Sequence, residues 1–232
     1  MIRSILAVPL VALCLCAQQP GAVSAQPVPA GTRAPAAVPK SSGRVPSTAE
    51  ERAVVLEMTK IRMFPRAYAK YLRALGLRFE GTLWRLNRHV PIRTNEGRAA
   101  ILEAAEFLEQ VQPIPGVLQF SEGLHYAARD HVLDQGPTGQ TGHVGVDGST
   151  FKERIHRYGQ QESLIGEVIN YGEETARMTV IQLVIDDGVP DRGHRKNIFN
   201  PNFKTAGAAI GYHKGYGAMT VVDMADAFTE KP

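Results

Sequence analysis

Both cysteines of the chain lie near its N-terminus, and this position constrains how the remainder can fold. Cys14 and Cys16 belong to an apolar run over residues 5–17, which Arg3 precedes and small residues ending at Ala25 follow. This is the pattern of a secretory signal peptide. Cleavage near Ala25 would leave a mature chain without cysteine. Such a chain forms no disulfide although it is exported, so its stability must come from a hydrophobic core.

The sequence divides into three parts. We predict a signal peptide over residues 1–25, a proline-rich linker over 26–48 and a single domain over 49–232. Within the domain we expect a helical N-terminal part, residues 49–112, and a core that bears a cavity, residues 117–228. The N-terminal apolar run is too short to span a bilayer comfortably, so we expect no transmembrane segment in the mature chain. The predicted location is secreted or periplasmic, with lipoprotein processing at a cysteine as an alternative.

Charge is distributed unevenly along the chain. The formal net charge is +3, but residues 60–98 hold ten basic and two acidic residues, whereas residues 99–193 hold fifteen acidic and six basic ones. Two interpretations are open: the halves neutralise each other within the fold, or a basic face meets lipid head groups or an anionic cell-envelope polymer. No nucleic-acid-binding module is visible, so we expect no nucleic-acid partner.

Periodicity and capping residues predict a mixed set of helices and strands. We expect helices from Ser47 or Thr48 to a break at Pro65, and over residues 66–75, 95–112, 122–135, 151–158 and 176–187, with strands over 205–212 and 218–228. Thr94 and Thr150 are predicted helix caps, and residues 79–94 are expected to be irregular or extended. On the helix over 122–135 we expect His131 to be packed and His125 to lie at the surface. Gly207 and Gly211 predict a close backbone approach or a bulge.

A polar loop over residues 187–200 follows the last apolar helix and contains His194. Polar groups in such a loop need partners wherever they are buried. Helical phase over residues 176–187 puts Asp187 on the apolar side and Asp186 on the polar side. A carboxylate at Asp187 needs a cation, a metal or a hydrogen-bond network. Our hypothesis is that His194 shares a cavity with His143, Glu167 and Asp187, the two loop histidines and two carboxylates that are candidate ligands.

Two imidazoles with one or two carboxylates suit zinc or another divalent cation, with His143 and His194 as the metal ligands. The spacing of these residues matches no local metal-binding motif, so a hydrogen-bonded network or four unrelated polar residues are alternatives. The His-Glu-x-x-His and Gly-x-Ser-x-Gly motifs are absent, as is a cysteine nucleophile. Catalytic residues are therefore unknown. A metal-dependent, peptidase-like hydrolase would use Glu167 as its general base.

The ordered motifs of the chain resemble those of the CAP superfamily, the cysteine-rich secretory, antigen 5 and pathogenesis-related 1 proteins, in their bacterial secreted branch. The matching segments are Gly142-His143 followed by Asp147-Gly148, then Gly166-Glu167-Val168-Ile169, then Gly193-His194-Arg195-Lys196-Asn197-Ile198. The resemblance implies an α+β fold, a three-layer α-β-α sandwich with a small antiparallel sheet. It also implies a central cavity with two histidines and two acids that binds zinc in some members.

By position, His143, His194 and Glu167 match the cavity residues of the family, and Asp187 fits the second acid best. The chain departs from the pattern at this acid, which is Asp rather than Glu, and at Val168, where Asn is usual. The leading interpretation is a secreted CAP domain that binds a divalent cation, with a lipid or a cell-envelope component as a further candidate ligand and no catalysis required. The hydrolase and a structural or protein-interaction module remain the alternatives.

Overall fold

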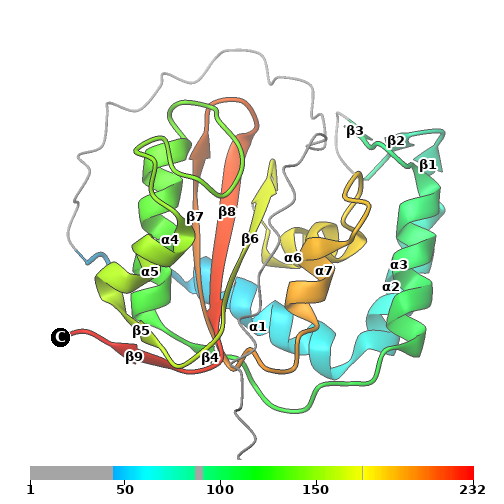
Figure 1. Cartoon of the computed structure of the whole chain (residues 1–232). Coiled ribbons are helices and arrows are strands. Elements are labelled where there is room, and N and C mark those ends of the chain that lie inside the picture. Colours follow the sequence, from blue (N-terminus) through cyan, green and yellow to red (C-terminus); the bar gives the residue numbers. More distant parts are fainter. Residues whose placement is uncertain (1–43, 87–90, 174) are drawn as a thin grey trace, which may run out of the picture.

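Helices cover both faces of the central sheet (Figure 1). This computed structural model describes residues 44–86, 91–173 and 175–232. The predicted signal peptide and the linker up to residue 43 lie outside the described residues. Among the described helices, none has the length and apolar composition needed to cross a bilayer.

The helices are α1 (Ala49–Met63), α2 (Pro65–Gly76), α3 (Arg98–Gln110), α4 (Glu122–Gln135), α5 (Phe151–Tyr158), α6 (Ala176–Ile185) and α7 (Gly193–Ile198). The strands are β1 (Phe79–Glu80), β2 (Leu83–Trp84), β3 (Ile92–Arg93), β4 (Gln119–Phe120), β5 (Gly159–Gln161), β6 (Ile165–Tyr171), β7 (Thr205–His213), β8 (Gly217–Ala225) and β9 (Phe228–Glu230).

The main sheet has the strand order β4-β7-β8-β6. Its three long strands are antiparallel, whereas the two-residue strand β4 pairs with β7 in parallel. Strand β8 is central, and its register places Asp223 opposite Glu167 of β6 on one side and Gly207 of β7 on the other. Small separate sheets form from β1-β2-β3 and from β5-β9.

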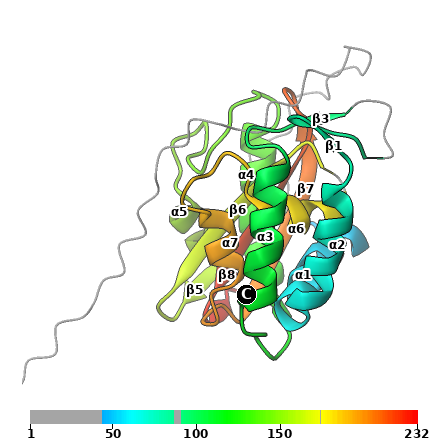
Figure 2. The same cartoon turned by 90° about the vertical axis from the view of Figure 1, so that its right-hand side faces the viewer.

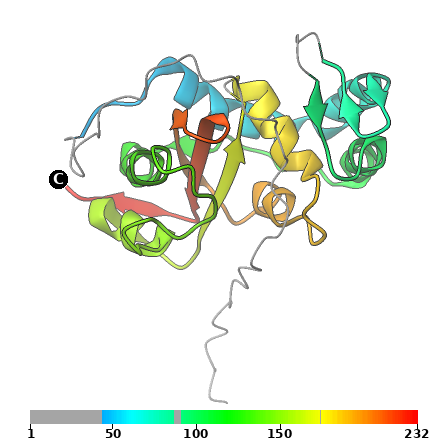
Figure 3. The ribbon, with the colours of Figure 1, turned by 90° about the horizontal axis from the view of Figure 1, so that it is seen from above.

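The layers of the sandwich lie side by side when the molecule is seen from above (Figure 3). Helices α4 and α5 cover one face of the main sheet, and α1, α6 and α7 lie against the other. Helices α2 and α3 pack together outside this second layer, in front of the sheet in Figure 2. The larger hydrophobic core fills the side of α1, α3 and α6, and two smaller clusters lie under α4 and α5. The predicted three-layer α-β-α sandwich is therefore confirmed.

Local signals set several helix boundaries as predicted. Thr48 caps α1 in a reciprocal capping box with Glu51, and Thr150 and Glu153 form the same motif at α5. Each box satisfies backbone N–H groups that have no partner within the helix. Pro65 lacks an N–H and begins α2 directly after α1 ends, because proline is tolerated in the first turn of a helix but not in its interior.

The predicted start of α3 is wrong by three residues. Thr94 does not cap it, because its hydroxyl donates to the carbonyl of Thr82 instead. Gly97, with φ of 62°, is the N-cap, and the helix begins at Arg98. The expected extended segment before it forms the β1-β2-β3 sheet, apart from residues 87–90, which lie outside the described residues.

Helix α4 packs very closely on β7, and this corrects the prediction for His125. That histidine is 1% exposed, and its ring nitrogens lie 2.7 Å from the carbonyl oxygen of Ala208 and 3.1 Å from that of Val45. The approach depends on Gly207, where an added Cβ atom would lie 2.1 Å from the backbone nitrogen of His125. The predicted close approach at this glycine is confirmed.

The two ends of the described chain meet on the side of α4 and β9. Arg44 donates to the carbonyl oxygens of Lys231 at 3.2 Å and of Pro232 at 2.6 Å. The contact between Val45 and His125 fixes the same segment to α4. Residues 44–48, the described end of the predicted linker, are therefore held against the domain.

Substitution Gly207→Ala tests the close approach of α4 and β7. The new methyl group has only backbone atoms to displace, so we expect a loss of about 3 kcal/mol in the free energy of unfolding, measured by urea denaturation. Gly76→Ala is the matched control, because its Cβ would meet side-chain atoms at ordinary distances of 3.4 and 3.6 Å. It should leave stability unchanged or raise it by up to about 1 kcal/mol. Equal midpoints for the two variants would contradict the packing described.

Candidate functional site

Two histidines from separate segments lie together beside Glu167 of β6. His143 belongs to the loop after α4, and His194 is the second residue of α7. Their ring centroids are 6.4 Å apart, with 44° between the ring planes. Their side chains are 27% and 14% exposed, so both rings are accessible from solvent.

The loop that carries His143 is fixed by hydrogen bonds at Gly142. Its carbonyl accepts from Nε2 of His131 at 2.8 Å and from Gln135 at 2.9 Å, and its N–H donates to the Tyr171 hydroxyl at 2.9 Å. The φ of Gly142 is 104°, a value that side-chain-bearing residues rarely adopt. The position of the neighbouring histidine is therefore set by the backbone before it.

Glu167 of β6 is the carboxylate behind His143. Nδ1 of His143 lies 2.8 Å from Glu167 Oε1, while Arg154 of α5 donates to Oε2 at 2.7 Å and to the carbonyl of His143 at 3.1 Å. Burial raises the pKa of Glu167, but the hydrogen bond from His143 and the charge of Arg154 outweigh it, so the pKa falls below its ordinary value. Glu167 is therefore an ionised acceptor that joins the loop, the strand and α5.

Asp186 is the carboxylate behind His194. Its Oδ1 lies 2.7 Å from Nδ1 of His194, and its Oδ2 accepts the backbone N–H of His194 at 2.9 Å and that of Arg195 at 3.3 Å. Asp186 is 3% exposed and has a left-handed conformation, with φ of 58°, at the end of α6. One residue thus orients the imidazole and binds two free N–H groups at the start of α7.

The prediction that Asp187 shares a cavity with His194 is wrong. Its carboxylate accepts the backbone N–H of Asn95 at 2.6 Å and that of Glu96 at 2.8 Å, which connects the end of α6 to the segment before α3. Helical phase selected Asp187 because it assumed that α6 continues to that residue. The helix ends at Ile185, and the left-handed residue after it redirects the chain, so the periodicity of the helix no longer applies.

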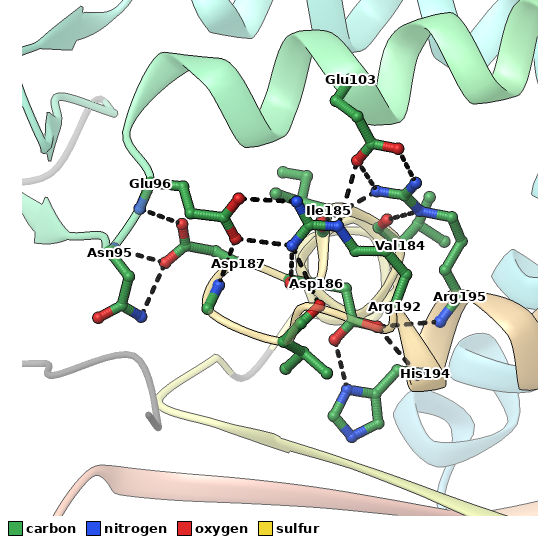
Figure 4. A network of polar contacts seen from close by, with 12 residues as sticks. Asn95, Glu96, Glu103, Val184, Ile185, Asp186, Asp187, Arg192, His194 and Arg195 are labelled. Carbon is green, nitrogen blue, oxygen red and sulfur yellow. Dashed lines mark hydrogen bonds and ion pairs between the residues drawn. The ribbon is translucent and has the colours of Figure 1, made fainter. Parts of the chain in front are cut away.

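The two arginines beside His194 close the end of α6, as Figure 4 shows. Arg195 donates to the carbonyls of Val184 at 2.6 Å and Ile185 at 3.1 Å, and forms two hydrogen bonds to Glu103. Arg192 donates to the carbonyl of Asp186 at 2.7 Å and forms two hydrogen bonds to Glu96. Both guanidinium groups therefore satisfy carbonyls at the end of α6 and balance acids of α3 and the segment before it.

The arrangement assigns a tautomer to each histidine of the site. A carboxylate oxygen accepts hydrogen bonds, so in the neutral form of each ring Nδ1 carries the proton and Nε2 holds a lone pair. Within the described residues, neither Nε2 has a hydrogen-bond partner. Carboxylates that bind Nδ1 while Nε2 remains free are the usual outer shell of a metal-binding histidine.

The two imidazoles fit a divalent cation in donor type, with a small adjustment in distance. Zinc bonded to both Nε2 atoms at about 2.0–2.1 Å would bring the ring centroids to about 5–6 Å, so the rings, now 6.4 Å apart, would need to approach by about 0.4–1.4 Å. No group of three or more His, Cys, Asp or Glu side chains within the described residues forms a metal-binding set. Two protein ligands would leave the other coordination positions to water or to a bound molecule.

Sequence reasoning missed two buried residues around Glu167, Arg154 and Asp223, whereas His131 is packed there as predicted; all three are at most 1% exposed. Burial lowers the pKa of His131, whose Nδ1 has no hydrogen-bond partner among the described residues. Arg154 offered a weak signal, as a basic residue beside Ile155 on a short amphipathic helix. Asp223 offered a similar one, as an acid within an apolar strand.

Comparison with known proteins gives the family of the chain. The profile of the cysteine-rich secretory protein family, CAP, matches residues 94–224, which include the whole site. Among solved structures, an outer surface protein from Borrelia burgdorferi is similar, with 21% identity and a TM-score of 0.39 over 47% of this chain and 76% of that chain. No curated protein matches the chain. The family match spans more than half of the sequence, and the chain therefore belongs to the CAP family.

Proposed function

We propose that this chain is an exported CAP domain that binds a divalent cation, zinc in the first instance, between His143 and His194. The observation that carries the proposal is the pairing of each ring, through Nδ1, with its own buried carboxylate. This pairing leaves Nε2 without a partner in two partly exposed rings whose centroids lie 6.4 Å apart. Export is supported by the N-terminal sequence pattern, and a zinc ion there would present open coordination positions to a ligand.

The rim of the site supports a ligand with apolar surface next to its metal-binding group. Val144 and Val146 follow His143 and are 59% and 43% exposed. Their loop is fixed, because the Gly145 N–H donates to the Ser149 carbonyl at 2.8 Å and the Val146 N–H donates to Asp134. A lipid or an acylated envelope component would combine such a surface with an oxygen ligand for the cation.

The surroundings of Glu167 argue against its use as a general base. Its side chain is fully buried, and its oxygens bind His143 and Arg154. A general base must reach the proton that it abstracts, directly or through one water. We therefore favour binding over hydrolysis as the role of this site.

Zinc retention by the mature protein tests the proposal. We expect one zinc ion per chain after dialysis at neutral pH, and loss of at least about 100-fold in affinity for His143→Ala and His194→Ala, because each removes one of two protein ligands. His156→Ala is the matched control, since this partly exposed histidine lies outside the site and contacts Gln161. Negligible zinc in the wild-type protein, measured by elemental analysis, would overturn the proposal.

The two adjacent aspartates should separate binding from stability. Asp186→Asn weakens the acceptor behind His194, so we expect a loss of about 10–100-fold in zinc affinity, measured by calorimetry. Asp187→Asn removes the charge from hydrogen bonds to two backbone N–H groups, so we expect a loss of about 1–3 kcal/mol in the free energy of unfolding with zinc affinity unchanged. Weaker zinc binding by Asp187→Asn, with unchanged zinc affinity for Asp186→Asn, would contradict this assignment and indicate that Asp187 belongs to the site.

A further inference from the structure

Asp223 lies fully buried in the middle of the central sheet. It is 0% exposed, and neither oxygen of its carboxyl group has a hydrogen-bond partner among the described residues. An ionised carboxylate in such a position is costly unless cations or N–H donors surround it. Its neighbours therefore decide its protonation.

Groups of different elements face this carboxyl. Glu167 lies directly opposite on β6, Arg154 comes from α5, and Asp130 comes from α4, while Gly207 on β7 contributes no side chain. Burial and the charge of Glu167 raise the pKa of Asp223 well above its ordinary value, and Arg154 only partly opposes them. The fully buried His131 also comes from α4, and burial lowers its pKa, which favours its neutral form.

One proton resolves both the charge and the missing hydrogen bond. Glu167 already binds its single full cation, Arg154, and accepts from His143. A second negative charge on Asp223 would have no cation of its own and would repel Glu167. A protonated Asp223 instead donates its O–H to the neighbouring carboxylate, and the pair carries one negative charge in total.

We propose that Asp223 is a neutral hydrogen-bond donor that positions Glu167 and, through it, sets the tautomer of His143. The assignment rests on the proposed function, because it gives Asp223 a role in the histidine site. Asp223 is fully buried and so does not contact a ligand itself. Arg154 donates to Oε2 of Glu167, and a donor at Asp223 would fix the same carboxylate further, which keeps Oε1 at Nδ1–H of His143 and leaves Nε2 free.

Two spectra of the wild-type protein test the protonation directly. Carbon-13 NMR at pH 7 should show the Asp223 carboxyl as a protonated acid, and nitrogen-15 NMR should show His143 with its proton on Nδ1. A carboxylate signal for Asp223 at pH 7 would overturn the proposal without any variant.

Variants test the positioning role. Asp223→Asn keeps an N–H donor toward Glu167, so zinc affinity should stay within about threefold and the His143 spectrum should not change. Asp223→Val removes the donor, so we expect about tenfold weaker zinc binding and a mixture of His143 tautomers. Thr220→Val is the matched control, a buried hydroxyl without a partner on the opposite face of β8. Equal spectra and affinities for the Asn and Val variants would contradict the role.

The pH dependence of stability provides a third readout. The pKa of Asp223 is raised in the folded protein, so its protonation stabilises the fold fully only below the pKa that this carboxyl has in the unfolded chain. This contribution is lost as pH rises through the pKa of the folded state. The Asp223→Asn variant has no titrating group at this position, so its stability does not fall for this reason as pH rises. Its melting temperature should therefore rise relative to wild type between pH 4 and pH 7, and a constant difference would oppose the proposal.

Failure of the proposal can be distinguished from failure of the zinc site. If the wild-type protein binds no zinc, the carboxyl and imidazole spectra of wild type and variants still decide whether Asp223 positions Glu167. If zinc binds but Asp223 is ionised, only the positioning role is overturned. If Asp223→Val does not fold, the wild-type spectra remain the deciding measurement.

Discussion

The site depends on how α6 ends. The last carbonyls of a helix have no hydrogen-bond partner within the helix. At the end of α6, two arginines beyond the helix donate to these carbonyls. Arg195 and Arg192 are in turn balanced by Glu103 and Glu96, so the reversal of the chain at Asp186 is fixed on both sides. Because Asp186 is the left-handed residue of that reversal, the geometry that closes the helix also places the carboxylate behind His194.

The two halves of the site are built from different kinds of partner. The carboxylate of Asp186 is satisfied by backbone N–H groups and one imidazole, without a hydrogen bond from an arginine or lysine side chain among the described residues. Glu167 is satisfied by a buried arginine and an imidazole, and it lies opposite a second buried acid. The two imidazoles therefore have similar first partners but different electrostatic surroundings. An asymmetric ligand would distinguish them.

Local chemistry made much of the fold predictable from sequence. Capping residues such as Thr48 and Thr150, and the break at Pro65, act within a few residues of their own position. Ordered motifs predicted the neighbourhood of His143, Glu167 and His194, which the structure brings together. The start of α3 was not predictable, because the acceptor for the N–H groups before it is Asp187, 91 and 92 residues further along the chain.

The remaining errors also have a long-range origin. Deciding between Asp186 and Asp187 requires the backbone conformation of the first residue after α6. Hydrophobic periodicity carries no information about that conformation, so it selected Asp187 wrongly. The role of Asp223 could not be predicted from sequence because it depends on the register of β8 with β6, which places Asp223 opposite Glu167. His125 looked like a surface residue because the helix face that meets β7 includes polar positions, whose partners are backbone carbonyls of distant segments.

The contact between Arg44 and the last two residues has a mechanical consequence. Both ends of the described chain leave the domain on the side of α4 and β9, away from α7 (Figure 1). A tether attached through either end, to a surface or to a fused protein, would hold the domain from the same side. A tension applied between the two ends would load the Arg44 contact before it reached the central sheet.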